Sequence, residues 1–225
     1  MTVLYHASRR LRGAAAAILL SVAAGPALAQ AGDPVAELPA GTYGLDRAHA
    51  SLIFRVDHLG FSHFTARFTR FDATLDFDPA DPTAMQVSAT VDAASIETDY
   101  PDPASYDFNA DLRGAPWLDA AQHPQMTFVS TAVVPTGALS ADVTGDLTLR
   151  GVTRPVTLAV TFNGGYAGHP LDPSGSRIGF SARGTLMRAD FGMGFGIPEP
   201  GTTMGVGNAV EVIVEAEFTR PKDGG

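Results

Sequence analysis

The sequence predicts an all-β protein, and three observations support this class. Apolar and polar residues alternate with a period of two in many short segments, turn-forming residues separate these segments, and no stretch has the spacing of a long amphipathic helix. Without crossover helices the strands must run antiparallel. Eight or nine strands that are apolar on one side fit a barrel or a sandwich, and we favour an eight-stranded antiparallel barrel because closure leaves no exposed edges.

The alternation is clearest from Phe71 to Asp78, where every second residue is apolar and the others are mostly acidic. The same pattern predicts nine strands in all, at residues 51–58, 63–70, 71–78, 85–92, 126–134, 142–149, 156–162, 177–188 and 210–218. A short helical insert is expected at Ser105–Arg113, between Pro103 and Gly114, with a second turn near Trp117–Ala121.

The first 29 residues have the three parts of a secretory signal peptide. Three arginines precede the apolar run Ala14–Ala24, and the small-residue triplet Ala27-Leu28-Ala29 follows it. The run is shorter than the roughly 20 residues of a membrane-spanning helix, and no second apolar run follows. We therefore expect export to the periplasm, cleavage after Ala29 and no membrane span, by a Sec or twin-arginine route that the sequence leaves open.

The rest of the chain is expected to hold one domain. Residues 30–40 are predicted to form a flexible lead-in, residues 41–221 the barrel, and residues 222–225 a tail. There is no cysteine, so the domain must be stable without disulfides.

Composition excludes two classes of function. The net charge is −9, and removal of the three leader arginines makes it −12, so a phosphate backbone is repelled and nucleic acid is not an expected partner. The only lysine is Lys222, in the tail, so a phosphate-binding loop of the P-loop type lacks its lysine.

Small residues at inward positions suggest a ligand cavity. Along residues 177–188 one parity is apolar and should face inward, and two of its members, Ala182 and Gly184, lack bulk. Eight strands enclose enough space for packed side chains or for one small ligand, and the small residues favour the ligand. A packed core remains the alternative, because glycines also mark bulges and the helical insert could fill the interior.

Arg188 ends the same inward row and is the first candidate to hold the polar head of a ligand. Arg113, in the insert, and Arg150, before the turn at Gly151, are further candidates. A salt bridge from Arg188 to Asp190 or another carboxylate is an equally good interpretation.

Catalytic and metal sites have weaker support. His49, His58 and His63 are the only cluster of histidines, and His58 and His63 could meet across a hairpin to make a weak metal site. Hydrogen-bonded histidines near a turn are the favoured interpretation. There is no cysteine nucleophile, no Gly-x-Ser-x-Gly elbow and no Gly-x-Gly-x-x-Gly motif, so we expect neither an enzyme nor a cofactor nor a bound metal.

The order of short motifs resembles the YceI-like family of exported, lipocalin-like proteins that bind polyisoprenoids or other long amphiphiles. The resemblance extends from about Gly41 to Thr219. The motifs that carry it are Tyr43 with Leu45-Asp46 and His49, Phe54-Arg55-Val56, His58-Leu59-Gly60, Ser95-Ile96-Glu97-Thr98, Leu112-Arg113, His123-Pro124 with Thr127-Phe128, Gly145 through Val156, Gly179-Phe180-Ser181-Ala182 and Arg188-Ala189-Asp190-Phe191-Gly192. The chain departs from the family pattern at Asn109, Asp111 and Pro116-Trp117-Leu118, in the insert expected to border the cavity.

The resemblance implies a lipocalin-like barrel of eight strands that holds an isoprenoid or fatty chain, with polar residues near the mouth. The residues expected to bind this ligand are Phe54, His58, Arg113, Trp117, Leu147, Arg150, Phe180, Ala182, Gly184 and Arg188. The first hypothesis is therefore an exported protein that transports, stores or sequesters an amphiphile, as a monomer or a homodimer. The alternative is a periplasmic stress protein or enzyme that acts on an amphiphilic substrate near His58 and His63.

Overall fold

The computed structural model describes Val35 and residues 37–221. The predicted signal peptide, the predicted tail and most of the predicted lead-in lie outside these residues. The strands are β1 Gly41–His58, β2 Ser62–Phe68, β3 Phe71–Phe77, β4 Gln86–Asp92, β5 Ile96–Glu97, β6 Gln125–Gly137, β7 Ser140–Leu149, β8 Val152–Tyr166, β9 Ser176–Met187 and β10 Val206–Arg220. The helix is α1 Phe108–Arg113, and the 3-10 turns are Pro82–Ala84, Ala93–Ser95 and Arg188–Phe191.

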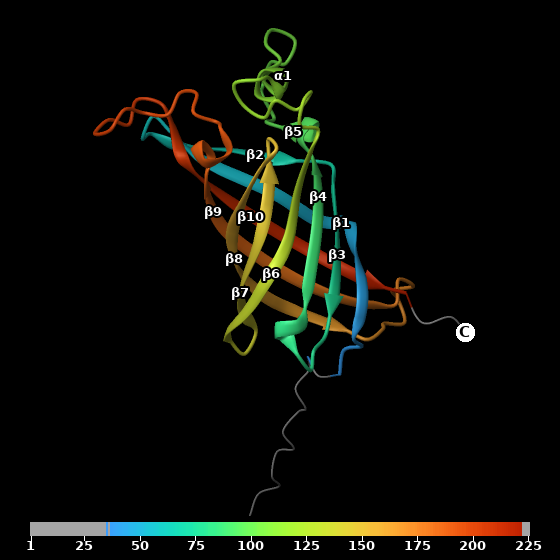
Figure 1. The fold of residues 1–225 in the computed structure, drawn as a ribbon. Helices are drawn as coiled ribbons and strands as arrows, with labels where there is room; N and C mark the ends of the chain where they lie inside the picture. Colours follow the sequence, from blue (N-terminus) through green and yellow to red (C-terminus); the bar gives the residue numbers. More distant parts are fainter. Residues whose placement is uncertain (1–34, 36, 222–225) are drawn as a thin grey trace, which may run out of the picture. The chain divides into compact units, whose positions relative to one another are not determined.

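The strands form one antiparallel sheet that closes into a barrel, as predicted. Its order is β10-β9-β8-β7-β6-β4-β3-β1, and β1 pairs again with β10 to close the ring of eight. The helix α1 and the short strand β5 lie beyond one end of the barrel, where the long loop between β9 and β10 also lies (Figure 1). Among the described residues, no helix has the length and hydropathy needed to cross a membrane.

The nine predicted strands all occur, and most extend further than the sequence indicated. Strand β1 begins ten residues before the predicted start at residue 51, because Gly41–Gly44 pairs with β3. The predicted helix at Ser105–Arg113 is shorter, since α1 begins at Phe108 after Asp107, whose carboxylate accepts a hydrogen bond of 2.8 Å from the Ala110 amide.

Two apolar clusters form the core. One contains residues of the insert and the β9–β10 loop, such as Leu112, Leu118, Phe191 and Met193. The other contains Tyr43, Ile178, Phe218 and their neighbours, and Leu38 of the predicted lead-in packs into it. Part of the lead-in is therefore built into the fold.

The inward glycines accommodate neighbouring side chains. A Cβ atom on Gly184 would lie 2.5 Å from Leu158 Cδ2 and 2.8 Å from the Thr157 carbonyl oxygen, and one on Gly145 would lie 2.4 Å from Phe128 Cζ. Leu158 and Phe128 already occupy the space that the two glycines leave. These two positions hold glycine because neighbouring side chains pack closely against the strand there. The glycines therefore do not create the volume of the cavity.

An irregular part of β1 is held by Arg177 of β9. Four residues of β1, Asp46 to His49, stand opposite one residue of β10, Glu217. The Arg177 guanidinium donates to Asp172 at 2.9 Å, to Asp46 at 2.7 Å and to Glu217 at 2.5 Å. Burial lowers the pKa of Arg177, but these hydrogen bonds outweigh burial and raise it. The cluster fixes the bulge in place.

We expect Gly184→Ala to lower the free energy of unfolding by about 1 to 3 kcal/mol, because the new methyl group meets backbone as well as Leu158. Gly44→Ala is the matched control, since Gly44 is also a strand residue but has no atom within 4 Å of its Cβ position. Urea unfolding of both variants measures the difference. Equal stability of the two variants would contradict the packing role of Gly184.

Acid should weaken the Arg177 cluster. Hydrogen bonds from His49 and then from Arg177 lower the pKa of Asp46 from 3.8 to about 2. A carboxylate with a lowered pKa stabilises the fold above its unfolded pKa, and this stabilisation is lost as the pH falls through the folded pKa. The free energy of unfolding should therefore drop between about pH 4 and pH 2, with about 1 to 2 kcal/mol of the drop due to Asp46.

The Asp46→Asn variant provides the comparison, because it lacks this titrating group. Urea unfolding at pH 6, 4 and 2.5 should show a smaller drop for the variant than for the unaltered protein. The same drop in both proteins would show that Asp46 does not couple to folding.

Candidate functional site

The barrel encloses an apolar cavity of about 460 Å³. Its wall contains side chains from β1, β3, β4, β6, β7, β8, β9 and β10, almost all of them aliphatic or aromatic. The charged side chains among the described lining residues are Asp72 and Arg188. A cavity of this size and polarity suits one apolar ligand with few polar contacts. The expected ligand cavity is therefore present, in place of a fully packed core.

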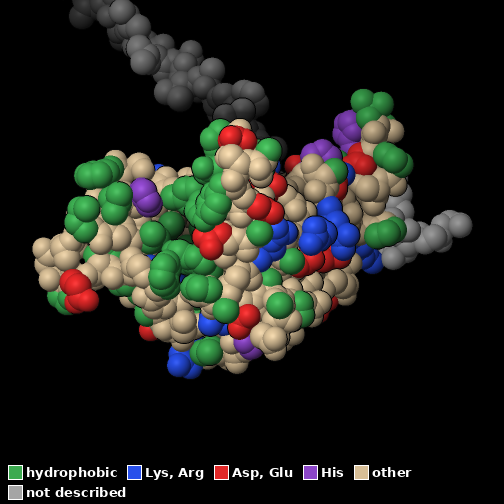
Figure 2. All heavy atoms as spheres, turned by 90° about the horizontal axis from the view of Figure 1, so that it is seen from above, with side chains coloured by type: hydrophobic (Ala, Val, Ile, Leu, Met, Phe, Trp, Pro, Cys, Tyr) green, Lys and Arg blue, Asp and Glu red, His purple; other side chains and the backbone are tan. Residues whose placement is uncertain are grey.

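Different segments cover the two ends of the cavity. At the end with the insert, the lining includes Trp117, Leu118 and Met193. Seen from this end, hydrophobic side chains gather over the barrel (Figure 2). At the other end the lining includes Pro82, Met85 and most of the hairpin residues from Pro135 to Ala141, and the described residues that line this end include no charged side chain.

Six of the ten predicted binding residues line the cavity, namely Phe54, Trp117, Leu147, Phe180, Ala182 and Arg188. The other four, His58, Arg113, Arg150 and Gly184, are not among the lining residues. Gly184 has the predicted inward parity, but the side chain of Leu158 covers it. The residues that form the apolar wall were thus easier to predict than those near its ends.

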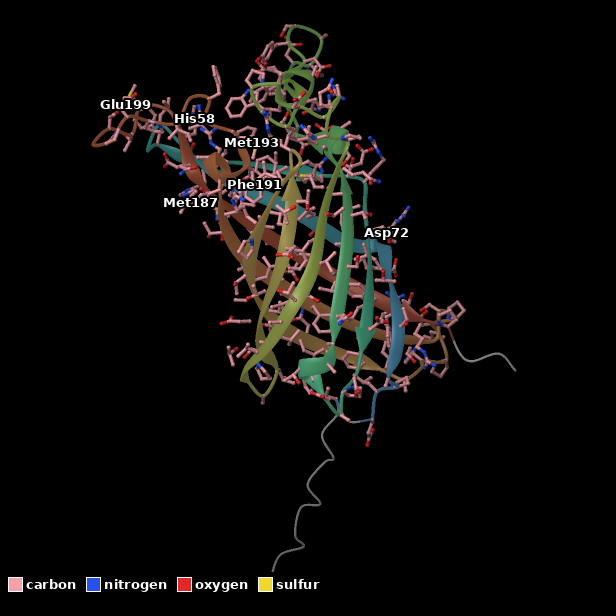
Figure 3. The ribbon with its side chains drawn as sticks, in the orientation of Figure 1. His58, Asp72, Met187, Phe191, Met193 and Glu199 are labelled. Carbon is pink, nitrogen blue, oxygen red and sulfur yellow. The ribbon has the colours of Figure 1, made fainter. Side chains whose placement is uncertain are left out.

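Arg188 begins the 3-10 turn Arg188–Phe191, at the covered end where Figure 3 labels Phe191, and is only 3% exposed. Its guanidinium donates hydrogen bonds of 2.7 to 2.8 Å to four backbone carbonyls, those of Met193, Phe195, Val206 and Gly207. It also lies over the Trp117 ring, with 5.3 Å between Cζ and the ring centroid. Burial lowers the pKa of Arg188.

These contacts give Arg188 a structural role. An arginine has five N–H donors, and four of them are used on carbonyls of the β9–β10 segment. The salt bridge to Asp190 that the sequence suggested is not formed, since within the described part of the chain Arg188 makes no ion pair. Its role as a ligand for the head group stays a prediction.

The other two predicted head-group arginines hold the insert. Arg150 donates to the carbonyls of Ala115, at 2.7 Å, and Trp117, which ties the insert to the β7–β8 turn. Arg113 makes an ion pair with Asp107, with 3.5 Å between Nη2 and Oδ2. Both side chains fix the segment that covers this end of the cavity.

The two histidines that could have met across a hairpin, His58 and His63, do not meet. In the β1–β2 hairpin His58 pairs with Ser62, and His63 pairs with Asp57. Successive residues of a strand point to opposite faces, so His58 and His63 project on opposite sides of the hairpin and cannot share a metal ion. The register of the β1–β2 hairpin therefore excludes a metal site shared by His58 and His63.

A different group has the spacing for a cation. Single ligand atoms of Asp46, His49 and Glu217 all lie within 4.8 Å of one another. The Arg177 guanidinium donates to both carboxylates, however, so a positive charge already sits among these ligand atoms. We interpret the cluster as an ion-pair network of the fold.

Sequence reasoning missed several residues of the cavity wall, of which Leu52, Phe68, Phe71 and Asp72 are the most informative. Leu52 lies in β1, whereas Phe68, Phe71 and Asp72 lie where β2 passes into β3. Asp72 is on the flank of the barrel, away from Phe191 and Met193 (Figure 3). One signal was available, because no glycine, proline, asparagine or aspartate separates the two strand patterns at residues 63–70 and 71–77. Such a junction predicts two strands in line along one neighbour.

Comparisons with known proteins agree with this architecture. The family model described as the YceI-like domain matches residues 43–218. A UPF0312 protein of Pseudomonas savastanoi pv. phaseolicola is 39% identical over 188 residues, which cover 82% of this chain and 89% of that protein. A UPF0312 protein of Pseudomonas putida is also 39% identical, over 186 residues, 81% of this chain and 88% of its own.

Two solved structures share the fold. The crystal structure of Burkholderia cenocepacia BcnA has a TM-score of 0.64 and 26% identity, and covers 77% of this chain and 98% of its own. A structure described as a polyisoprenoid binding domain from Saccharophagus degradans has a TM-score of 0.52 at 15% identity, and covers 81% of this chain and all of its own. With a family model that matches most of the closed barrel and relatives at 39% identity, the chain belongs to the YceI-like family.

Proposed function

We propose that this protein is exported to the periplasm and holds a long apolar or amphiphilic molecule, an isoprenoid or a fatty chain, inside its barrel for transport, storage or sequestration. The observation that carries the proposal is the apolar cavity of about 460 Å³ that is lined by all eight strands of the closed barrel. A wall of this kind stabilises an apolar chain by burial, at roughly 25 cal/mol per Å² of apolar surface.

Two further observations support a binding role. The polyisoprenoid binding domain from Saccharophagus degradans has the same fold, so a barrel of this type is compatible with such a ligand. The lining among the described residues also lacks a set of converging acid, base or nucleophilic groups, because Asp72 and Arg188 come from different parts of the wall. We therefore favour binding over catalysis.

The direct experiment is mass spectrometry of chloroform extracts from the purified protein. A prenyl or acyl compound in stoichiometric amount is the expected result, followed by titration of the delipidated protein with a prenyl alcohol. An extract without lipid, together with no binding of the alcohol, would overturn the proposal.

A variant that fills the cavity tests the site itself. Ala182 is buried in β9 and lines the cavity, so Ala182→Phe should abolish binding of the prenyl alcohol or weaken it at least tenfold. Because the new ring enters open space, the melting temperature should change little. Ala159→Phe is the matched control, since Ala159 of β8 is exposed. Retained binding by Ala182→Phe would show that the ligand lies elsewhere.

Export has its own test. Intact-mass measurement of the protein from a periplasmic fraction should give a chain that starts at Gln30, as the Ala27-Leu28-Ala29 triplet predicts. Recovery of the uncleaved chain in the cytoplasm would contradict export and leave the binding proposal to be judged by the lipid experiments.

A further inference from the structure

A second pocket of about 480 Å³, more polar than the cavity, opens on the flank of the barrel, and we call it the side pocket. Its wall includes Arg47 and Leu52 of β1, Phe68 of β2, Arg70, and Phe71 and Asp72 of β3. It lies where the pairing of β1 is interrupted. Gly41–Gly44 of β1 pairs with β3 and Leu52–His58 pairs with β2, so the stretch between these segments has no ladder partner on this edge.

Two sets of contacts hold the edges of the side pocket apart. On one edge Ser95 draws the β2–β3 junction away from β1, because its carbonyl accepts from the Thr69 amide at 3.0 Å and its hydroxyl accepts from the Arg70 amide at 3.1 Å. On the other edge Arg177 holds the bulge of β1 through Asp46 at 2.7 Å. These contacts determine where the two edges of the side pocket lie.

The side pocket adjoins the apolar cavity. The same five residues, Leu52, Phe68, Phe71, Asp72 and Val91, line both. Three of them are large apolar side chains from the seam between β1 and the β2–β3 junction. The cavity and the side pocket are therefore neighbours, and the side chains of this seam stand between them.

The side pocket brings arginines together in an acidic chain. Three arginines, Arg47, Arg67 and Arg70, line it against two aspartates, in a chain whose net charge is −9. Each arginine is paired with one carboxylate: Arg47 with Asp72, Arg67 with Asp99, and Arg70 with Asp92 at 2.7 Å.

These pairs are exposed, and their guanidinium groups keep donors available. Arg47 uses a single N–H on Asp72, and no other hydrogen bond joins its side chain to the described residues. Its side chain is 69% exposed and that of Arg70 is 62% exposed, so an incoming oxyanion can reach both. Arg188, the charged group at the covered end, has four of its five donors on carbonyls instead.

We propose that the side pocket binds the anionic head, a phosphate or carboxylate, of the amphiphile whose chain fills the barrel. The head contacts Arg47 and Arg70 and takes the place of Asp72 on Arg47. This assignment rests on the proposed function, because it needs a chain in the cavity. It places the head on the flank between β1 and β3, away from the end that the insert covers.

The experiment titrates the delipidated protein with a prenyl monophosphate and with the prenyl alcohol of the same chain length. The phosphate should bind more tightly than the alcohol. Arg47→Met and Arg70→Met should each weaken phosphate binding roughly three- to tenfold and leave the alcohol unchanged, as expected for loss of a charge-assisted contact. Asp72→Asn should strengthen phosphate binding severalfold, because it removes the competing carboxylate.

Arg183→Met is the matched control. Arg183 of β9 is 61% exposed and paired with Glu211 at 3.5 Å, but it lines neither the cavity nor the side pocket. Its loss removes the same charge and should leave both affinities unchanged. Inorganic phosphate should compete poorly with the prenyl phosphate, since it lacks the chain.

The outcomes separate the two proposals. If neither probe binds the unaltered protein, the proposed function fails and the head site fails with it. If both probes bind equally, and the Arg47 and Arg70 variants match Arg183→Met, the head site is wrong while the proposed function stands.

Opposite effects of Arg47→Met and Asp72→Asn on phosphate binding support the site, whereas a loss of binding in both would show that the pair is only structural. Competition by inorganic phosphate as strong as by the prenyl phosphate would overturn a site for a lipid head.

Discussion

The pairing of β1 is the constraint on which the rest of this structure depends. One edge of β1 pairs with β10 and closes the barrel. The other edge pairs first with β3 and then with β2. Closure removes the exposed edges of the sheet and encloses the apolar cavity. Sharing one edge between two strands leaves an interval without a partner, and the side pocket lies there. The cavity and the side pocket therefore both follow from the way in which β1 pairs with its neighbours.

Local patterns were sufficient to predict part of the wall of the barrel. Phe180 and Ala182 were placed inward by a period of two alone, because side-chain direction in a strand depends only on neighbouring residues. The same pattern could not distinguish the two reasons for a small inward residue. Ala182 borders open space, whereas Gly184 lies under Leu158, and that difference depends on a partner strand far away in sequence.

The residues near the ends of the barrel were harder to predict for physical reasons. The partners of Arg188 are backbone carbonyls, which every residue carries, so no sequence signal identifies them. The relation of His58 to His63 depends on hairpin register, and a shift of one residue reverses which face each side chain occupies. The side pocket was missed because it needs the split pairing of β1. The junction after residue 70 indicates two strands in line, but only the closed sheet shows that β1 is the neighbour they share.

The chemistry of the wall also limits what can determine the orientation of a ligand. Apolar surface stabilises any long chain in proportion to the area buried, so it discriminates poorly between the two ends of that chain. A charged side chain next to such an interior is costly unless it is paired. Two charged side chains are among the described residues of the wall. Arg188 donates hydrogen bonds to four carbonyls, and Asp72 is paired with Arg47. The first set of contacts is buried, and its loss would leave carbonyls without donors, whereas the second pair is open to solvent. A polar head can replace a protein group only at the second pair without leaving a buried charge uncompensated. The proposed head site therefore makes the direction of a bound amphiphile depend on Arg47 and Asp72.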